Sequence, residues 1–288
     1  MKVTGFSFIK NAIKYQYPVV EALQSILPLC DEIVVAVGDS EDDTRSLVSS
    51  IDPKIRIIDT TWNTELREDG KALADETNKA FRAIDNNADW CFYIQGDEVV
   101  HENDYNEIQK AMHAYKDQKN VDGLLFKYRH FYGSFDYIGV SSKWYKREIR
   151  IIKNDKSIFS YRDAQGFRKA NNQKLNVKPL NAYIHHYGWV REPEKMSRKQ
   201  TDFGKLWGGA EWQPPKVYEA FDYKEQIDAL QKFKGTHPKV MQQRIANMNW
   251  QFDYDISYNK LHIKEKFKNL VEQITGRRPF DHNNYKIV

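Results

Sequence analysis

WCFYIQGDEVV, residues 90–100, joins five residues suited to a buried strand to a polar turn of Gln95, Gly96, Asp97 and Glu98. Two interpretations of this turn are open. Asp97 or Glu98 could cap a following helix, which is an ordinary use of such a turn. Alternatively, a carboxylate at the strand end could bind a divalent cation, and Gly96 would let a phosphate approach the backbone closely. The surrounding sequence has to decide between a turn and a site.

The first hundred residues alternate candidate strands and helices. Strands are expected at 3–9, 33–37, 55–58 and 90–94. Helices are expected at 18–29, 41–50 and 70–84. The segment IVVAV at 33–37 is continuously apolar, which is typical of a parallel strand buried on both faces. This β-α-β order predicts a parallel sheet with helices on both faces.

Polar residues follow two of these strands. Ligands of such sheets bind beyond the carboxyl ends of the strands, so Asp39 and Asp97 should share one edge. Asp39 could accept a hydrogen bond from the N3–H of a uracil ring, or it could belong to an ordinary loop. Gly70 and Lys71 begin a helix and could meet a diphosphate through backbone N–H groups and one cation, although a solvated lysine is the usual case.

The second half of the chain has a different residue pattern. A helix is expected at about 102–117, and residues 121–190 are rich in aromatic, arginine and isoleucine residues without helical spacing. We expect mostly antiparallel strands there, for example at 123–132 and 148–153. Helical patterns return from about 193, and residues 258–275 place apolar residues on one face.

The composition bounds the class of protein. The chain has 288 residues, of which 41% are hydrophobic and 14% aromatic, so a folded globular protein is expected. A formal charge of +4 permits an anionic substrate but does not by itself indicate nucleic acid. Cys30 and Cys91 lie in apolar segments and indicate buried thiols. The N-terminus has no signal-peptide pattern and no long apolar run follows, so a cytoplasmic protein is expected.

Three stretches carry a resemblance to a known family. CDEIVVAVGDSEDDT (30–44), GKALADETNKA (70–80) and WCFYIQGDEVVHE (90–102) resemble, in order and separation, the nucleotide-binding half of GT-A glycosyltransferases of the family-2 type, in a bacterial branch. Further stretches resemble the same branch: FYGSFDYI (131–138), WYKREIRIIKN (144–154), DAQGFRK (163–169) and HHYGWVR (185–191).

This resemblance implies a fold, a domain division and an activity. The implied fold is α/β, a GT-A mixed sheet with helices on both faces and a C-terminal helical extension. The catalytic domain would span 1–210, with a nucleotide-sugar-binding half at 1–118 and an acceptor half at 119–210, and the extension would span 211–288. The implied activity is transfer of a sugar from a nucleotide-diphosphate donor, UDP-linked by this resemblance, to a glycan or lipid-linked acceptor, with inversion, in surface polysaccharide synthesis.

The resemblance also implies site residues. Such enzymes hold Mn²⁺ or Mg²⁺ with an Asp-x-Asp motif, but here Gln95 stands in the first position and only Asp97 matches. Gln95 and Gly96 would still contact the donor, and metal independence stays open. Asp39 matches the uracil-reading position, and Lys71 falls near the diphosphate. His186 fits a late metal ligand, although it could equally be a strand residue hydrogen-bonded in the core.

Sugar transfer with inversion needs a base for the acceptor hydroxyl. Asp163 lies in the segment that resembles the acceptor side, so it is the first candidate, and Glu98 and Asp136 are alternatives. Asp163 could instead pair with Arg162 or Arg168.

Two rival functions remain at this stage. A nucleotidyltransferase would also use a metal at a sheet edge, and a non-catalytic protein could bind sugars or single-stranded nucleic acid through its basic and aromatic residues. The helix at 258–275 carries lysines beside an apolar face. It could rest on the inner face of an anionic membrane, or pack on the catalytic domain.

Overall fold

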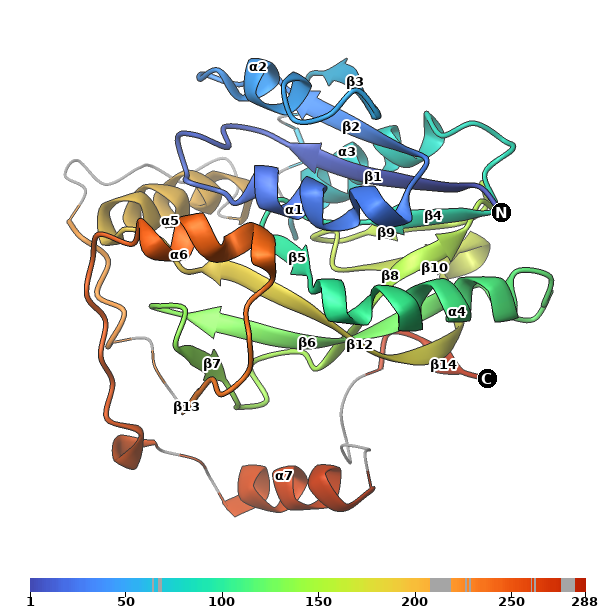
Figure 1. Ribbon diagram of the computed structural model, residues 1–288. Coiled ribbons are helices and arrows are strands. Elements are labelled where there is room, and N and C mark those ends of the chain that lie inside the picture. The colour runs from blue at the N-terminus through green and yellow to red at the C-terminus, as the bar shows by residue number, and fades with distance from the viewer. Residues whose placement is uncertain are drawn as a thin grey trace.

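The computed structural model describes residues 1–63, 65–66, 69–207, 219–225, 227, 229–259, 261, 263–275 and 283–288. Four parallel strands form one half of its large sheet, in the order β4-β1-β2-β3. They are β1 (Val3–Ile9), β2 (Glu32–Gly38), β3 (Ile55–Thr60) and β4 (Trp90–Tyr93). The expected parallel strands are therefore confirmed, and they lie at the top of the view in Figure 1.

Helices cover both faces of this half, as expected. Alternate residues of β2 point to opposite sides: Val35 packs in the core cluster that contains Leu23 of α1 (Val19–Ile26), and Val34 packs in the cluster that contains Phe81 of α3 (Lys71–Arg82). The two-residue period of a strand thus supplies a separate apolar surface for each helix. The short helix α2 (Thr44–Ser49) contacts β3.

The second half of the sheet is mixed. β8 (Arg147–Lys153) runs antiparallel to β4, and β6 (Gly123–Tyr132) runs antiparallel to β8. The long strand β12 (Asn176–Trp189) pairs parallel with β6 and antiparallel with β5 (Glu98–Val100). The mostly antiparallel character expected for 121–190 is confirmed, and the parallel β6–β12 pair is the exception.

Shorter elements complete the fold. Three strands form a separate small sheet: β9 (Phe159–Tyr161), β10 (Gly166–Lys169) and β11 (Gln173–Lys174). Helix α4 (Tyr105–Tyr115) lies between β5 and β6 in the chain, and α5 (Pro193–Trp207) and α6 (Gln242–Ala246) follow β12. Cys30 and Cys91 are buried free thiols, as expected.

The chain after residue 210 returns to the large sheet. β13 (Leu230–Lys232) pairs with β7 (Tyr137–Gly139), and β14 (Lys286–Ile287) pairs with β12. This region therefore contributes strands as well as helices, because backbone groups at both exposed strand edges accept a partner. The domain boundary at 210 stays a prediction.

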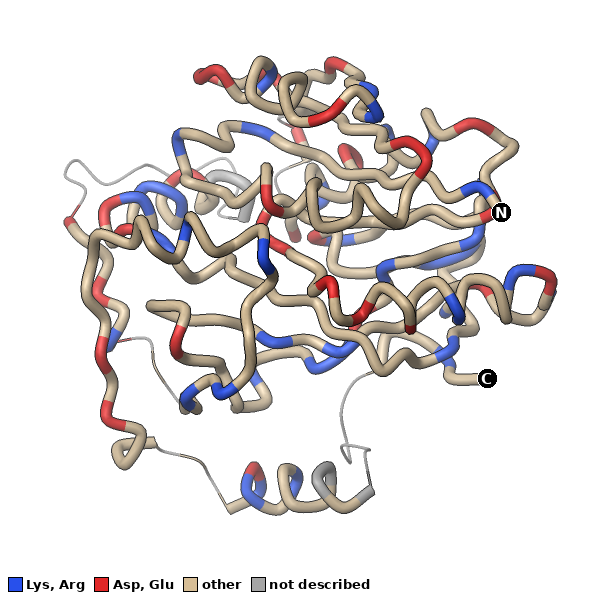
Figure 2. The backbone as a smooth tube through the Cα atoms, viewed as in Figure 1, with Lys and Arg blue, Asp and Glu red and all other residues tan. Residues whose placement is uncertain are grey.

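Helix α7 (Ile263–Thr275) exposes its apolar side chains. Four large ones are more than half exposed: Ile263, Phe267, Leu270 and Ile274. The helix also carries Lys264, Glu265, Lys266 and Lys268, so three of these four charged residues are basic (Figure 2). Membrane contact by this helix stays a prediction, and these four side chains are not buried against the rest of the chain. Among the helices in the described residues, none combines the length and apolarity needed to cross a bilayer.

Candidate active site

The turn after β4 is fixed to strand β12. The amide N–H of Glu98 donates to the carbonyl of Gln95 at 3.0 Å, which closes the turn, and the amide N–H of Tyr187 donates to the carbonyl of Asp97 at 2.8 Å. This cross-link brings His186 beside the Asp97 side chain, with His186 Nε2 3.8 Å from Asp97 Oδ2. The two residues that the family resemblance implies as metal ligands therefore lie next to each other.

Gly188 makes this approach possible. A Cβ at this position would lie 2.6 Å from His186 Nε2 and 2.8 Å from Asp97 Oδ2, which is inside van der Waals contact. Any larger residue would have to push one of the two side chains aside. The glycine of HHYGWVR thus has a steric role in assembling the pair.

A chain of hydrogen bonds orients the His186 ring. The Tyr145 carbonyl can only accept, so His130 Nε2 donates to it at 2.8 Å. Burial lowers the pKa of His130 well below its usual value, and the adjacent His186 adds to this, so the ring is neutral and its Nδ1 accepts. His186 Nδ1, 3.0 Å away, is then the donor. Burial also lowers the pKa of His186, against the opposing effect of Asp97, so His186 Nε2 presents a lone pair toward the carboxylate.

Helix α5 adds a lysine to the same place. Lys199 Nζ lies 3.8 Å from Asp97 Oδ2 and donates to the Gly188 carbonyl at 3.1 Å. Burial lowers the pKa of Lys199 to about 7, with a further contribution from Arg191. Burial by itself would raise the pKa of Asp97, but the positive charges of Lys199 and Arg191 oppose it, and that pKa lies below its usual value. Asp97 is therefore an ionised carboxylate whose side chain is 13% exposed.

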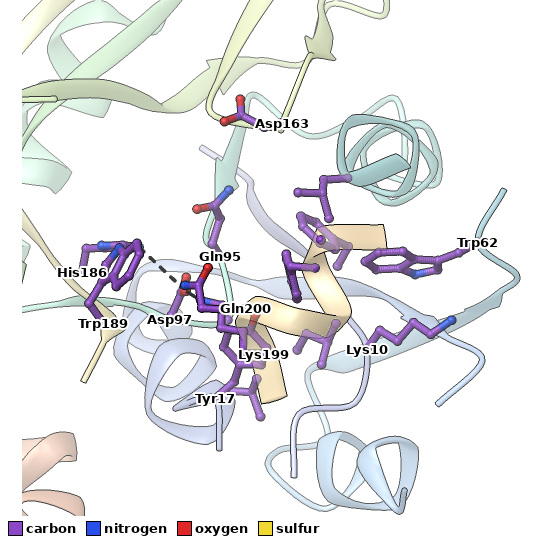
Figure 3. A pocket seen from close by; sticks show the side chains of 17 residues that line it. Lys10, Tyr17, Trp62, Gln95, Asp97, Asp163, His186, Trp189, Lys199 and Gln200 are labelled. Atoms are coloured by element: carbon purple, nitrogen blue, oxygen red, sulfur yellow. Dashed lines mark ion pairs between the residues drawn. The ribbon is translucent and has the colours of Figure 1, made fainter. Parts of the chain in front are cut away.

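These side chains line one end of an elongated cavity of about 420 Å³. Figure 3 shows Asp97, His186 and Trp189 at one end of it and Lys10 and Trp62 at the other, with helix α5 crossing between them. The volume lies within the range of small-molecule sites, roughly 300–1,000 Å³. The cavity is built at the carboxyl ends of β1 and β4, where ligands of such sheets bind.

Asp39 lies at the Lys10 end. Its Oδ1 accepts from Lys10 Nζ at 2.7 Å and from the Trp62 amide N–H at 3.4 Å, and both of these partners line the cavity. Gly38 allows the Trp62 indole to lie against β2, since a Cβ there would lie 2.4 Å from Trp62 Nε1. Desolvation works against ionisation of Asp39, but the bonds from Lys10 and Trp62 lower its pKa. Asp39 is therefore an exposed carboxylate at the rim of the cavity.

Gln95, Gly96 and Asp163 also line the cavity. Gln95 Nε2 donates to the Tyr93 hydroxyl at 3.2 Å and to the Ala164 carbonyl at 3.3 Å, which leaves its side-chain oxygen as an acceptor. Burial raises the pKa of Asp163 above its usual value. A carboxylate with a raised pKa is the stronger base, so Asp163 has a position and a chemistry suited to proton transfer.

Glu98 and Lys71 lie elsewhere. The Glu98 carboxylate is completely buried and accepts from Arg150 Nε at 2.8 Å, Arg150 Nη2 at 2.7 Å and the Tyr128 hydroxyl at 2.7 Å. It does not line the cavity, because this ion pair holds it inside the sheet, so Asp163 is the better placed of the two candidate bases. Lys71 is an exposed residue at the start of α3, two positions before Leu73, which does line the cavity.

Asp97 and His186 are placed so that a divalent cation could bind between them. Two acceptors, a carboxylate oxygen and an imidazole lone pair, face each other across 3.8 Å, an arrangement that a cation between them would stabilise. Mg²⁺ and Mn²⁺ commonly take one or two protein ligands and complete their shell with water and substrate phosphates. Within the described residues no group of three or more His, Cys, Asp or Glu side chains is arranged as a metal site.

Several cavity residues carried no signal in the sequence. Lys10, Tyr17, Trp62 and Lys199 reach the cavity from four different segments, and no motif marks them. Trp189 lies in HHYGWVR and could have been noticed as a ring next to His186.

Comparisons with known proteins give similarities of fold. No protein-family model matches the chain, and no curated protein matches it by sequence. Among solved structures it is similar to S. aureus TarS 1-349 in complex with UDP-GlcNAc, with 17% identity, 74% of this chain and 68% of that chain covered, and a TM-score of 0.41. It spans 39% of a longer TarS structure.

Other similar structures share less of the chain. Glucosyl-3-phosphoglycerate synthase from Mycobacterium tuberculosis, in complex with Mn²⁺, UDP and phosphoglyceric acid, is 17% identical over 45% of this chain and 43% of that chain, with a TM-score of 0.31. A 4-diphosphocytidyl-2C-methyl-D-erythritol synthase from Anaerococcus prevotii is 12% identical over 53% of this chain and 70% of that chain, with a TM-score of 0.32. These similarities concern the fold alone.

Proposed function

We propose that the chain is a glycosyltransferase that uses a nucleotide-diphosphate sugar. The observation that carries this proposal is that one elongated cavity has two chemically different ends. Lys10 and Trp62, with Asp39 at the rim, suit a nucleobase, because Asp39 can accept from a ring N–H such as that of uracil. Asp97, His186 and Lys199 suit a diphosphate and its counterion.

The cavity residues divide the chemistry among them. The acceptor hydroxyl attacks the anomeric carbon, its proton passes to the Asp163 carboxylate, and the bond between that carbon and the diphosphate oxygen breaks as the nucleoside diphosphate leaves. Lys199 lies where its ammonium group can contact the leaving group, and Gly96 lies where its backbone, which no side chain covers, can do the same. A divalent cation held by Asp97 and His186 would neutralise charge on the diphosphate. This arrangement corresponds to an inverting transfer.

The finer parts of the proposal concern the two substrates. We propose a UDP-linked donor, because Asp39 matches the uracil-reading position, and a glycan or lipid-linked acceptor in surface polysaccharide synthesis, because the second half of the chain resembles that branch. Lys71 and Gln95 would approach the donor from α3 and from the turn after β4. Similar structures in complex with UDP, UDP-GlcNAc and Mn²⁺ support this choice of ligands for a first screen.

The test compares the products of turnover and the binding of UDP. The purified chain is incubated with UDP-sugars and Mn²⁺, and release of UDP is followed with and without acceptors. UDP release supports sugar transfer, whereas pyrophosphate release from a nucleoside triphosphate and a sugar phosphate would establish a nucleotidyltransferase instead.

Calorimetry of UDP with Mn²⁺ then tests the diphosphate end. Asp97→Asn should weaken Mn²⁺-dependent UDP binding by at least about tenfold, since loss of even an outer-shell partner of a metal ligand costs this much. Asp117→Asn, an exposed residue after α4, is the matched control and should bind UDP like the native chain. Equal UDP binding by Asp97→Asn and the native chain would refute the assignment.

A further inference from the structure

A second cavity lies behind one wall of the first. It has a volume of about 260 Å³, and its lining includes Glu21, Phe135, Arg191, Arg244, Asn247 and Trp250. Tyr17 lines the first cavity, Arg191 lines the second, and the guanidinium carbon lies 4.6 Å from the centre of the Tyr17 ring. The two cavities therefore adjoin at this pair of side chains.

The charges around the second cavity are balanced in number. Arg244 Nε donates to Glu21 Oε1 at 2.7 Å and Arg244 Nη2 donates to Glu21 Oε2 at 3.2 Å, which forms an ion pair. Asn249 Nδ2 donates to Glu192 Oε1 at 2.8 Å. Two arginines and two glutamates line the cavity, so its formal charge is zero. A lining without net charge favours an uncharged ligand.

The Asn247 amide in the lining is left to bind a ligand, whereas Arg191 is bonded to the backbone. Arg191 is 1% exposed; its two terminal nitrogens donate to the carbonyls of Tyr15 at 2.7 Å and Gly188 at 3.0 Å. Its Nε–H makes no hydrogen bond within the described part of the chain and has almost no accessible surface. In the same described residues the Asn247 amide makes no side-chain hydrogen bond, although it can both donate and accept.

An aromatic surface completes the lining. Trp250 Nε1 donates to the Gly133 carbonyl at 2.7 Å, which fixes the indole plane, and the ring centre lies 6.5 Å from that of Phe135. A fixed aromatic plane beside mixed donors and acceptors matches a sugar ring, which has apolar C–H faces and hydroxyls that each donate and accept. The volume falls just below that of typical drug-sized sites, so it suits one sugar unit.

We propose that this second cavity is a subsite for a neutral sugar unit of the acceptor glycan, lying beyond the unit that receives the transferred sugar. The inference rests on the proposed function and deepens it by naming the acceptor as a neutral glycan of at least two units. Arg191 holds the backbone of Tyr15 and Gly188, and Gly188 lies beside Asp97, so the same residue braces both cavities. Occupation of the subsite would thus position the acceptor relative to the donor.

The test measures glycan binding separately from nucleotide binding. Neutral di- and trisaccharides of glucose, galactose and N-acetylglucosamine are screened against the full chain by saturation-transfer NMR, with and without UDP. At least one should bind in both conditions, with signals from the sugar C–H groups that face the indole. Asn247→Leu should reduce this binding at least tenfold, and Trp250→Phe, which keeps a ring but loses the bond to Gly133, should weaken it less.

The control is Asn106→Leu, the same change at an exposed position on α4, which should bind glycans like the native chain. Thermal unfolding and UDP binding of each variant report whether it is folded. Glycan binding that is equal in Asn247→Leu and the native chain would overturn the subsite, as would binding of acidic sugars alone. Native protein that binds UDP but none of the neutral glycans would overturn the subsite and leave the proposed function standing, whereas a chain that binds no nucleotide would refute the proposed function first.

Discussion

Replacement of Glu98 by glutamine tests whether the Glu98 carboxylate has a structural or a catalytic role. Glu98 accepts four hydrogen bonds: two from Arg150, one from the Tyr128 hydroxyl and one from the Gln95 amide N–H at 3.1 Å. Both charged side chains are 0% exposed. Glutamine keeps one acceptor oxygen, but its NH₂ group would face donors, and the guanidinium would lose its counter-charge.

The expected cost is a large share of the stability of the fold. Breaking a buried ion pair by removing one partner costs about 3–5 kcal/mol, because an uncompensated charge stays buried. At roughly 2 °C per kcal/mol for a chain of this size, the melting temperature of Glu98→Gln should fall by about 6–10 °C. Asp163→Asn should instead leave the melting temperature nearly unchanged and abolish UDP release with acceptor, because Asp163 lines the cavity and is only partly buried.

The assay is chemical denaturation together with thermal melting of both variants. The double variant Glu98→Gln with Arg150→Met should recover much of the loss, since an apolar replacement removes the unpaired charge. A loss below about 1 kcal/mol in Glu98→Gln would refute the reasoning, because it would show that the pair contributes no more than an exposed one. Loss of turnover in Glu98→Gln with stability unchanged would restore Glu98 as a candidate base.

Two further predictions concern the site and the effect of pH. Gly188→Ala should weaken Mn²⁺-dependent UDP binding, because the added Cβ displaces His186 or Asp97. Gly5→Ala is the control: its Cβ would lie 3.0 Å from core side chains, so it should destabilise the fold by about 1–3 kcal/mol without affecting UDP binding. Burial raises the pKa of Glu148 from 4.5 to about 8, so the folded chain keeps a proton that the unfolded chain loses. The stability that this group contributes is therefore present below pH 4.5 and is lost as the pH rises to about 8, by at most about 5 kcal/mol. Denaturation of Glu148→Gln from pH 5 to 9 should show a smaller fall in the free energy of unfolding than the native chain shows. An unchanged pH profile would contradict the assignment to Glu148.

The sequence determined the strands and their direction to a large extent. The bounds of β1 and β6 agree with the expected 3–9 and 123–132, because short segments rich in apolar and aromatic residues between polar segments favour strands. The order of strands and helices then fixed the parallel half of the sheet, and with it the edge where Asp39 and Asp97 lie.

The tertiary structure alone decided the roles of individual side chains at that edge. Asp97 and Glu98 are adjacent in sequence and chemically alike, yet one lines a cavity and the other is held by Arg150, 52 positions away. Likewise, nothing local to α5 shows that Lys199 lies 3.8 Å from Asp97. The physical reason is that secondary structure follows from short-range burial patterns, whereas the ionisation and function of a carboxylate depend on which distant charges and donors the fold places within a few ångströms of it.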